Sequence, residues 1–214
     1  SFRALEDLGI VKNGFSTRMG GASQGKFATM NFSYSRGDDP EHVLENFTRM
    51  ARALEVDRDR MVVSYQTHTT NVRRVTEEDL GKGVVRDRDY RDVDGLITDL
   101  PGVTLVTFYA DCVPLYLVDP VHRAIGLSHS GWRGTVAGMG AVTVRAMGEA
   151  FGTRPEDLVA CIGPSICRDC FEVGEEVVAE FEKAFRPEHH RGLFWPNGRP
   201  GKYQLDLWLA NRII

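Results

Sequence analysis

The segment between residues 95 and 128 constrains the fold most, because four short β-rich runs follow one another there with only tight turns between them. The runs are GLITD (95–99), VTLVTFY (103–109), VPLYLV (113–118) and RAIGLS (123–128). They are separated by turns at 101–102, 110–112 and 119–122. Successive strands joined by short turns pair antiparallel, so we expect an antiparallel sheet over this segment.

Other segments have helical periodicity. Asp39 and Pro40 suit the start of a helix whose apolar face carries Leu44, Phe47, Ala51 and Leu54. Helices are also predicted at 135–151, at 174–185 and over the last residues, and further strands at 61–65, 72–75 and 158–162. No repeat or linker interrupts the chain, so we expect one domain of mixed α/β type over residues 1–214.

Charge and hydropathy restrict the partners. Thirty acidic residues face 26 basic ones, for a net charge of −4, and no basic run is present, which argues against a nucleic-acid partner. No apolar stretch is long enough for a bilayer, and residues 1–8 lack the pattern of a signal peptide. We therefore expect a cytoplasmic protein with no membrane partner.

Three sites carry chemistry-bearing residues in unusual places. Asp111 and Cys112 follow the β-run 103–109, His129 precedes the GlyTrpArgGly segment, and His68 lies in the polar stretch GlnThrHisThrThrAsn. If 113–118 and 123–128 form a hairpin, its open end brings Cys112 to within a few ångströms of His129. The pair is then either a nucleophile with its base or two ligands of a metal.

A third soft donor would decide between these alternatives. If His68 joins, two imidazoles and a thiolate form a set suited to Zn²⁺ with a fourth position for water. Asp111 would then act as an acid–base group or orient a ligand imidazole. The three donors are far apart in the sequence and form no local metal signature, so the metal-free Cys–His reading stays open.

Two arginines and three further cysteines complete the candidates. Arg18, in the Gly-rich loop 14–31, and Arg133, between two glycines at a predicted helix start, are candidate phosphate-binding residues, although either would also suit an ordinary surface. Cys167-x-x-Cys170 has a metal or redox spacing. Without a second such pair, we interpret Cys161, Cys167 and Cys170 as structural or incidental thiols.

Several motifs together resemble a known family. GFSTRMGGAS, QTHTTNV, DGLITDLPGVTL, ADCVPLYLVDP, IGLSHSGWRGT, CIGPSIC and CFEVGEEV occur in the order found in the polyphenol-oxidase-like (laccase-domain) purine nucleoside phosphorylase family of the YfiH type. The resemblance runs from about Gly14 to Arg212 and implies that His68, Cys112 and His129 bind zinc. It also implies a layered mixed sheet flanked by helices, similar to a toxin deamidase. Ser130 replaces the usual alanine, and the family's C-terminal segment is expected to be missing after Ile214.

The resemblance implies several activities. They are phosphorolysis of adenosine, inosine and methylthioadenosine, adenosine deamination, copper-dependent phenol oxidation and the editing of peptidoglycan precursors. Six histidines suffice for one mononuclear site but not for multicopper centres, so phenol oxidation is the least supported. We expect a zinc-dependent enzyme, with copper as the alternative metal, whose partners are a purine nucleoside and phosphate. The alternatives are a metal-independent Cys–His amidohydrolase, a copper-dependent polyphenol oxidase and a non-catalytic zinc-stabilised binding protein.

Overall fold

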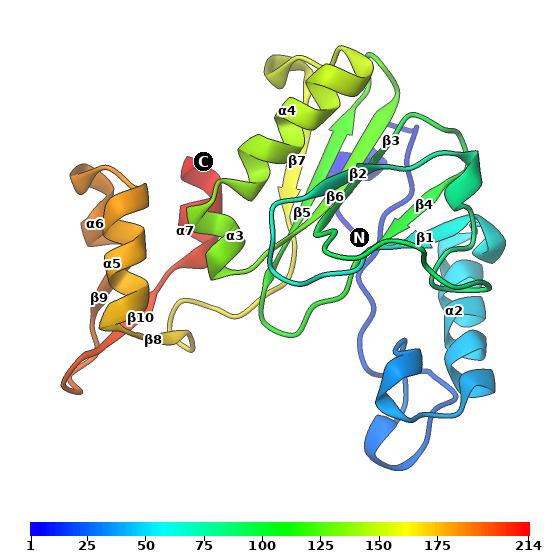
Figure 1. Ribbon diagram of the computed structural model, residues 1–214, viewed down its shortest axis with the longest axis horizontal. Coiled ribbons are helices and arrows are strands. Elements are labelled where there is room, and N and C mark those ends of the chain that lie inside the picture. The colour runs from blue at the N-terminus through cyan, green and yellow to red at the C-terminus, as the bar shows by residue number, and fades with distance from the viewer. The chain divides into compact units, whose positions relative to one another are not determined.

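The computed structural model describes residues 1–214 and divides into two compact units. Unit 1 comprises residues 1–63, 75–89 and 100–106, and unit 2 comprises residues 64–74, 90–99 and 107–214. Figure 1 labels the strands and most of the helices. The chain is of mixed α/β type with several sheets flanked by helices, as expected. That it forms a single domain stays a prediction. No helix combines the length and the apolar character that a membrane span requires.

Unit 1 is built around the predicted amphipathic helix. Helix α2 spans Pro40–Leu54, and the Asp39 side chain accepts a hydrogen bond from the backbone N–H of Glu41 at its start. Val43, Phe47 and Ala51 form its buried face. The other elements are α1 (Arg3–Glu6), η1 (Gly25–Phe27), η2 (Tyr34–Arg36), η3 (Arg58–Arg60), η4 (Glu77–Asp79) and the parallel pair β1 (Met61–Val63) and β4 (Thr104–Val106).

The Gly-rich loop of unit 1 is held by one buried amide. Asn46 is fully buried on α2 and accepts a hydrogen bond from the backbone N–H of Ala22. Its Nδ2 donates to the Ser23 hydroxyl and to the carbonyl of Asn31. Because each buried polar group of Asn46 has a partner in the loop, the loop is ordered despite its glycines.

Unit 2 contains a five-stranded sheet in the order β2–β3–β6–β5–β7. Its strands are β2 (Val72–Arg74), β3 (Gly95–Thr98), β5 (Val113–Asp119), β6 (Ala124–Ser130) and β7 (Val159–Ile162). Only β2 and β3 run parallel, and the other neighbours are antiparallel. The predicted hairpin of 113–118 and 123–128 is confirmed as β5 and β6. These are the longest strands, and β6 is the central one.

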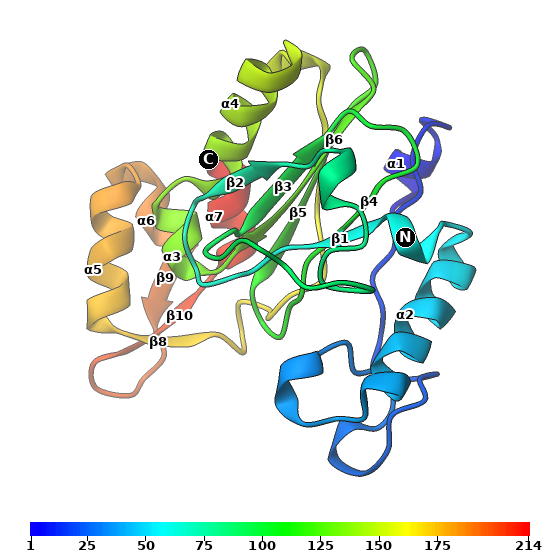
Figure 2. The same ribbon diagram turned by 45° about the vertical axis from the view of Figure 1, so that its right-hand side comes forward.

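Two helices follow β6. Helix α3 spans Trp132–Val136 and helix α4 spans Met139–Phe151, with η5 (Pro155–Asp157) after it. The prediction of one helix over 135–151 is therefore wrong at its first turn, because Gly138 has a left-handed backbone with φ of 73° that separates the two. Helix α4 lies along the sheet and contacts β2, β3 and β6, as Figure 2 shows.

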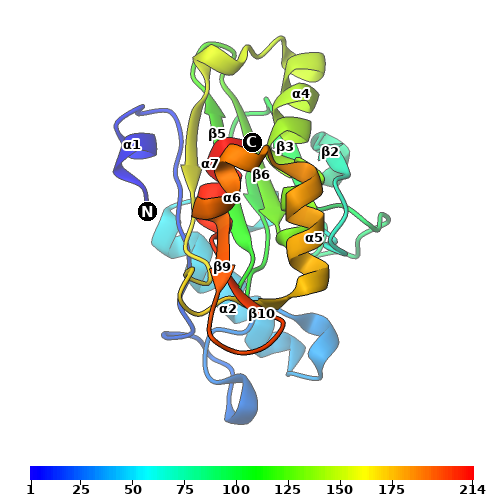
Figure 3. The same ribbon diagram turned by 90° about the vertical axis from the view of Figure 1, so that its left-hand side faces the viewer.

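A second layer of unit 2 contains a small antiparallel sheet, two strands of which, β9 and β10, are labelled in Figure 3. The sheet has the order β8 (Glu172–Gly174), β10 (Lys202–Leu205) and β9 (Phe194–Pro196). Helices α5 (Glu175–Ala184), α6 (Pro187–Leu193) and α7 (Leu207–Ile213) accompany it. Phe181, Leu193, Leu205 and Leu207 are buried in a core that also contains Val113 of β5. This shared core joins the second layer to the strand that follows Cys112.

One predicted strand takes a different place. The run 103–109 pairs with neither neighbour in the sequence, because only Thr104–Val106 is a strand and it pairs in parallel with β1 in unit 1. Residues 107–112 return to unit 2 as an irregular segment. An apolar pattern specifies that a segment is buried as a strand, but it does not specify which strand becomes its neighbour.

Candidate metal centre

The β5–β6 hairpin places Cys112 next to His129. Val113 pairs with Ser130 and Pro114 pairs with His129. Cys112, which directly precedes β5, therefore lies at the same open end of the hairpin as His129. His129 is 4% exposed, whereas Cys112 is half-buried. The predicted approach of these two residues is confirmed.

His68 completes a group of three donors from the turn between Tyr65 and β2. Its Nε2 lies 3.9 Å from the Cys112 sulfur, and its ring meets the His129 ring edge-on, with the centroids 5.0 Å apart. One donor atom from each of the three residues lies within 4.8 Å of the other two. His68 is exposed, so the group has one side open to solvent and a buried side formed by His129.

A single carboxylate, Asp94, organises both histidines. It is fully buried at the start of β3 and lies 2.8 Å from His129 Nδ1. The backbone N–H groups of Thr67, His68 and Thr69 all donate to it, at 2.9–3.1 Å. The Thr69 hydroxyl also donates to it, at 3.0 Å. Asp94 therefore fixes the ring orientation of one histidine and the backbone of the turn that carries the other.

The backbone at His68 shows why this support is needed. His68 has φ of 66°, a left-handed conformation that is uncommon for a residue other than glycine. Three consecutive N–H groups converging on one buried charge compensate for that conformation. On the other side, the His129 backbone N–H donates to the Asp94 carbonyl at 2.7 Å, so the histidine and its carboxylate are joined twice.

The Asp94–His129 pair perturbs both groups. Burial raises the pKa of Asp94, but hydrogen bonds from His129, Thr69 and Thr67 outweigh it and lower the pKa to about 2. Burial lowers the pKa of His129, but its contacts with Asp94 and Cys112 raise it to about 9. Asp94 is therefore a carboxylate at neutral pH. The Nδ1–H of His129 donates a hydrogen bond to Asp94 and keeps its proton, so Nε2 is the ring atom left for a ligand once its own proton is displaced.

The segment before Cys112 is held by side chains of unit 2. Gln66 donates to the carbonyl of Phe108 and accepts from its backbone N–H, so its amide pairs with that backbone as a strand would. The Tyr109 hydroxyl donates to the carbonyl of Ser128, and its ring lies 5.7 Å from that of His129. Burial raises the pKa of Tyr109 well above its ordinary value, so the hydroxyl stays protonated.

The three residues fit a small tetrahedral metal ion. Zinc binds imidazole nitrogen and thiolate sulfur at roughly 2.0–2.3 Å, which needs donor atoms close together and one position free. Gly131 leaves the necessary room, since a Cβ on it would lie 2.8 Å from Cys112 Sγ and 3.1 Å from His68 Cδ2. This is the structure's one group of three or more candidate donors, which suits one ion and not a multicopper cluster.

The remaining candidates, Asp111, Arg133 and Arg18, are all exposed. The backbone carbonyl of Asp111 accepts a hydrogen bond from the Ile166 N–H. Asp94, not Asp111, orients the imidazole. Arg133 is exposed on α3 with its guanidinium 4.2 Å from the Trp132 ring. Arg18 belongs to unit 1, where its carbonyl accepts from Thr29 and Met30. The roles of Asp111, Arg18 and Arg133 stay predictions.

Sequence reasoning missed Asp94, although a signal was present. Asp94 directly precedes the buried run GLIT, so burying its charge is costly unless several donors surround it. Asp94 is distant in sequence from both histidines, and only the pairing of β2, β3 and β6 brings the three together.

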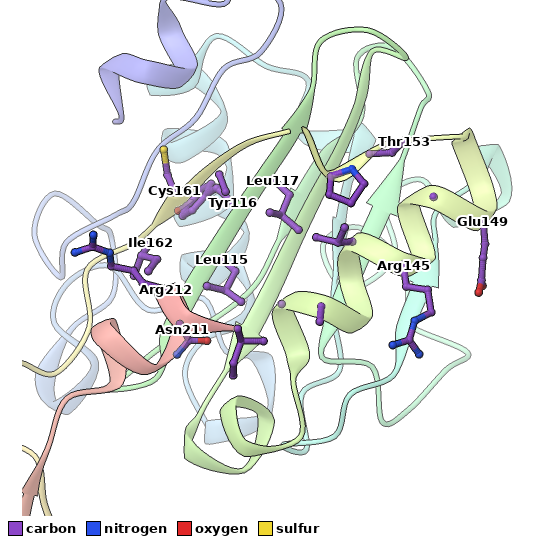
Figure 4. Close-up of a pocket in the computed structure, with 17 residues that line it drawn as sticks. Leu115, Tyr116, Leu117, Arg145, Glu149, Thr153, Cys161, Ile162, Asn211 and Arg212 are labelled. Atoms are coloured by element: carbon purple, nitrogen blue, oxygen red, sulfur yellow. The ribbon is translucent and has the colours of Figure 1, made fainter. Parts of the chain in front are cut away.

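A separate hollow of about 870 Å³ lies in unit 2 between the sheet and α4 (Figure 4). Leu115 and Tyr116 of β5, Cys161 of β7 and Arg145 and Glu149 of α4 contribute to its lining. Burial raises the pKa of the Cys161 thiol. None of the predicted site residues lines this hollow, which is therefore distinct from the donor group.

Comparison with known proteins places the geometry in context. Residues 12–214 match the family model described as multi-copper polyphenol oxidoreductase laccase. The chain is 38% identical to a purine nucleoside phosphorylase of Bacteroides thetaiotaomicron over 99% of its length and 78% of that protein. It is 35% identical to adenosine deaminase RL5 of an unknown prokaryotic organism, over 98% of the chain and 82% of that protein. The crystal structure of YfiH from Bacillus licheniformis superposes with a TM-score of 0.85 at 33% identity, over 92% of this chain and 73% of that one.

Proposed function

We propose that this chain, which belongs to the multi-copper polyphenol oxidoreductase laccase family, is a zinc-dependent enzyme that cleaves purine nucleosides with phosphate and deaminates adenosine. Two relatives support the substrate class, because one is named purine nucleoside phosphorylase and another adenosine deaminase. The family description names copper, but only one three-donor group is present in the chain, and multicopper oxidation needs several such groups.

The convergence of His68, Cys112 and His129 on one point, with both histidines fixed by Asp94, is the observation that carries the proposal. A carboxylate that orients a ligand imidazole is the usual support of a catalytic metal site. When bound, zinc supplies a Lewis acid and lowers the pKa of a water at its open position. The exposed side at His68 leaves room for a substrate.

The chain's other residues would bind and orient the substrate. Asp111 is exposed next to Cys112 and could exchange a proton with the purine during deamination. Arg133, two residues after the site-forming Gly131, would hold phosphate for phosphorolysis, since guanidinium groups recognise phosphate oxygens in pairs. Arg18, in unit 1, stays a predicted phosphate-binding residue. Both reactions would then use one site, and the presence of phosphate would decide between them.

The central experiment incubates the zinc-loaded protein with adenosine, with and without phosphate, and separates the products by chromatography. We expect adenine and ribose 1-phosphate with phosphate, and inosine without it. His68→Ala should abolish both reactions. His122→Ala, which changes a histidine outside the donor group, should leave them intact. If neither adenine, ribose 1-phosphate nor inosine is formed, the proposal is wrong.

The phosphate-binding role has a matched control within the chain. Arg133 and Arg168 are both exposed and both lie over a tryptophan ring, at 4.2 Å and 5.8 Å. Arg133→Met should raise the KM for phosphate with little change in the KM for the nucleoside. Arg168→Met should change neither. Equal effects of the two substitutions would remove Arg133 from the phosphate site.

A metal-independent amidohydrolase is the second candidate, and the arrangement of three side chains favours it. Cys112, His129 and Asp94 follow one another as nucleophile, base and orienting carboxylate do in cysteine hydrolases. Chelation decides between the candidates. If removing the metal leaves the activity unchanged while Cys112→Ala abolishes it, the hydrolase interpretation is correct. A zinc-stabilised binding protein would instead bind nucleosides without turnover and lose thermal stability on chelation.

A further inference from the structure

The turn that contains Cys167 and Cys170 has the features of a reactive dithiol. The two cysteines are separated by Arg168 and Asp169, and the backbone N–H of Cys170 donates to the carbonyl of Cys167 at 3.0 Å. Cys170 is exposed and Cys167 is half-buried, so a small molecule can reach the pair. Neither thiol belongs to the three-donor group, and Cys161 lines the separate hollow.

The two thiols of this turn are unequal. The pKa of Cys167 is lowered, first by its contact with the Cys170 thiol and then by the nearby backbone N–H groups of Asp169 and Cys170. The same contact with Cys167 raises the pKa of Cys170. A thiol with a lowered pKa beside one with a raised pKa is the arrangement of an attacking and a resolving cysteine.

The turn is attached to the segment that carries Cys112. The backbone N–H of Ile166 donates to the carbonyl of Asp111 at 3.0 Å, and that of Gly163 donates to the carbonyl of Pro114 at 2.8 Å. These two bonds bracket Cys112. On the far side of the turn, Gln204 of β10 donates to the carbonyl of Asp169 at 2.9 Å. Ile166, which directly precedes Cys167, therefore links the turn to the segment that carries Cys112. A disulfide within residues 167–170 would restrict the backbone next to this link.

We propose that Cys167 and Cys170 form a redox site, which exchanges with small-molecule disulfides such as oxidised glutathione and stiffens the segment that carries Cys112 when it closes. The Cys167 thiolate attacks one sulfur of glutathione disulfide and forms a mixed disulfide, releasing one glutathione thiolate. Cys170 loses its proton to solvent and attacks the Cys167 sulfur, releasing the second glutathione. Two protein thiols are oxidised, and one glutathione disulfide is reduced to two thiols.

The sequence offers a direct assay for this bond. Trypsin cleaves after Arg145, Arg168 and Lys183, because Pro155 protects the bond after Arg154, and yields peptides 146–168 and 169–183. Cys167 is in the first peptide and Cys170 in the second. The disulfide would join the two into one species that is lighter by two hydrogens than their sum. Folded full-length Cys161→Ser protein, in which Cys167 is the first peptide's one cysteine, is treated with glutathione mixtures, alkylated and digested.

We expect the joined species to rise in one two-electron transition with the ratio of glutathione disulfide to squared glutathione concentration. Cys170→Ser should trap glutathione on Cys167, and Cys167→Ser should react at least several-fold more slowly at Cys170. A joined peptide that forms only in denaturant, or equal trapping by the two variants, would overturn the assignment. None of these measurements depends on nucleoside turnover, so they are independent of the proposed function.

The attachment to Cys112 has its own readout. Closing a four-residue loop restricts local opening, so the amide of Ile166, whose N–H bonds Asp111, should exchange with solvent several-fold more slowly in the oxidised protein. The amide of Phe181 in α5 serves as the control and should be unchanged. Cys170→Ser protein, treated in the same way, should not show the slowing. Equal exchange of Ile166 in the oxidised and reduced wild type would show that the redox site is not connected to the Cys112 segment.

Discussion

Each end of the β5–β6 hairpin has a histidine that is paired with a buried aspartate, but the surroundings of the two pairs differ. At one end, Asp94 lies 2.8 Å from His129 Nδ1, and at the other, Asp119 lies 2.8 Å from His122 Nδ1. Both carboxylates are fully buried and both accept hydrogen bonds from backbone N–H groups. The His129 side chain is 5% exposed and that of His122 is 35% exposed.

The difference lies in what each carboxylate connects. Asp119 accepts from Val121 and His122, which lie in its own turn, so it stabilises the turn that joins the two strands. Asp94 joins β3 to β6 and to the turn of His68, three segments that are distant in the sequence. A buried Asp–His pair is therefore not a sign of function by itself. It becomes one where it fixes an imidazole beside further donors.

The largest expected effect separates the two carboxylates by metal affinity. Asp94→Asn removes the charge that orients His129 and holds the His68 turn, so we expect zinc affinity to fall by about 10–100-fold. Asp119→Asn should change it by less than about twofold, since Asp119 contacts no donor residue. Competition with a chromophoric chelator measures both. Equal losses in the two variants would mean that the effect arises from general destabilisation.

The converse experiment concerns stability. Asp119→Ala removes three hydrogen bonds to a buried charge at once, and we expect the free energy of unfolding to fall by about 2 kcal/mol or more. Urea denaturation followed by circular dichroism measures this. The zinc affinity of the folded variant should be that of the wild type. A variant as stable as the wild type would show that the turn does not depend on Asp119.

The same carboxylate predicts a pH dependence. Burial raises the pKa of Asp119, but the Thr153 hydroxyl, and after it the hydrogen bonds from His122 and Val121, outweigh burial and lower the pKa below its ordinary value. A lowered folded-state pKa stabilises the fold above the unfolded value, about 3.9, and the contribution is lost as the pH falls through the folded pKa. The stability difference between wild type and Asp119→Ala should therefore be complete at pH 6 and shrink toward pH 3. A constant difference over that range would contradict the assignment.

Two glycines after His129 sharpen the comparison further. A Cβ on Gly131 would lie 2.8 Å from Cys112 Sγ, whereas one on Gly134 would meet its nearest neighbour at 3.6 Å. The methyl group of Gly131→Ala would push the donor side chains apart, and such overpacking costs about 1–3 kcal/mol. If this cost falls on metal binding, zinc affinity should decrease by about tenfold. Gly134→Ala should leave the affinity unchanged. Zinc titration of the two variants tests this, and a wild-type affinity for Gly131→Ala would show that the room beside Gly131 is not needed.

The smallest effect is expected at His122. His122→Ala removes one hydrogen bond to Asp119 and leaves its backbone partners in place, so the loss should be about 1 kcal/mol of unfolding free energy. Its metal content should match that of the wild type, whereas His129→Ala should lose the metal. Unfolding curves and elemental analysis of the two variants measure this. A loss of metal from His122→Ala would show that the two ends of the hairpin are not independent.

The sequence predicted the parts of the site that local pattern encodes. Cys112 and His129 flank two runs of β-prone residues with a Pro-containing turn between them, and hairpin pairing alone brings them together. The role of Asp94 could not be predicted in this way, because it depends on β3 pairing with β6 and not with the run that follows it. The division between α3 and α4 depended on the backbone of Gly138, and glycine permits a left-handed conformation without requiring it.

The position of His129 within the sheet determines which part of the donor group can move. His129 lies on β6, which has neighbours on both sides, so its displacement would break hydrogen bonds to β3 and β5 together. His68 lies on an exposed turn, which Asp94 holds through backbone N–H groups and Asp92 holds through the side chains of Thr67 and Asn71. The group therefore has one wall fixed within the sheet and one side open to solvent, so metal exchange should proceed past His68.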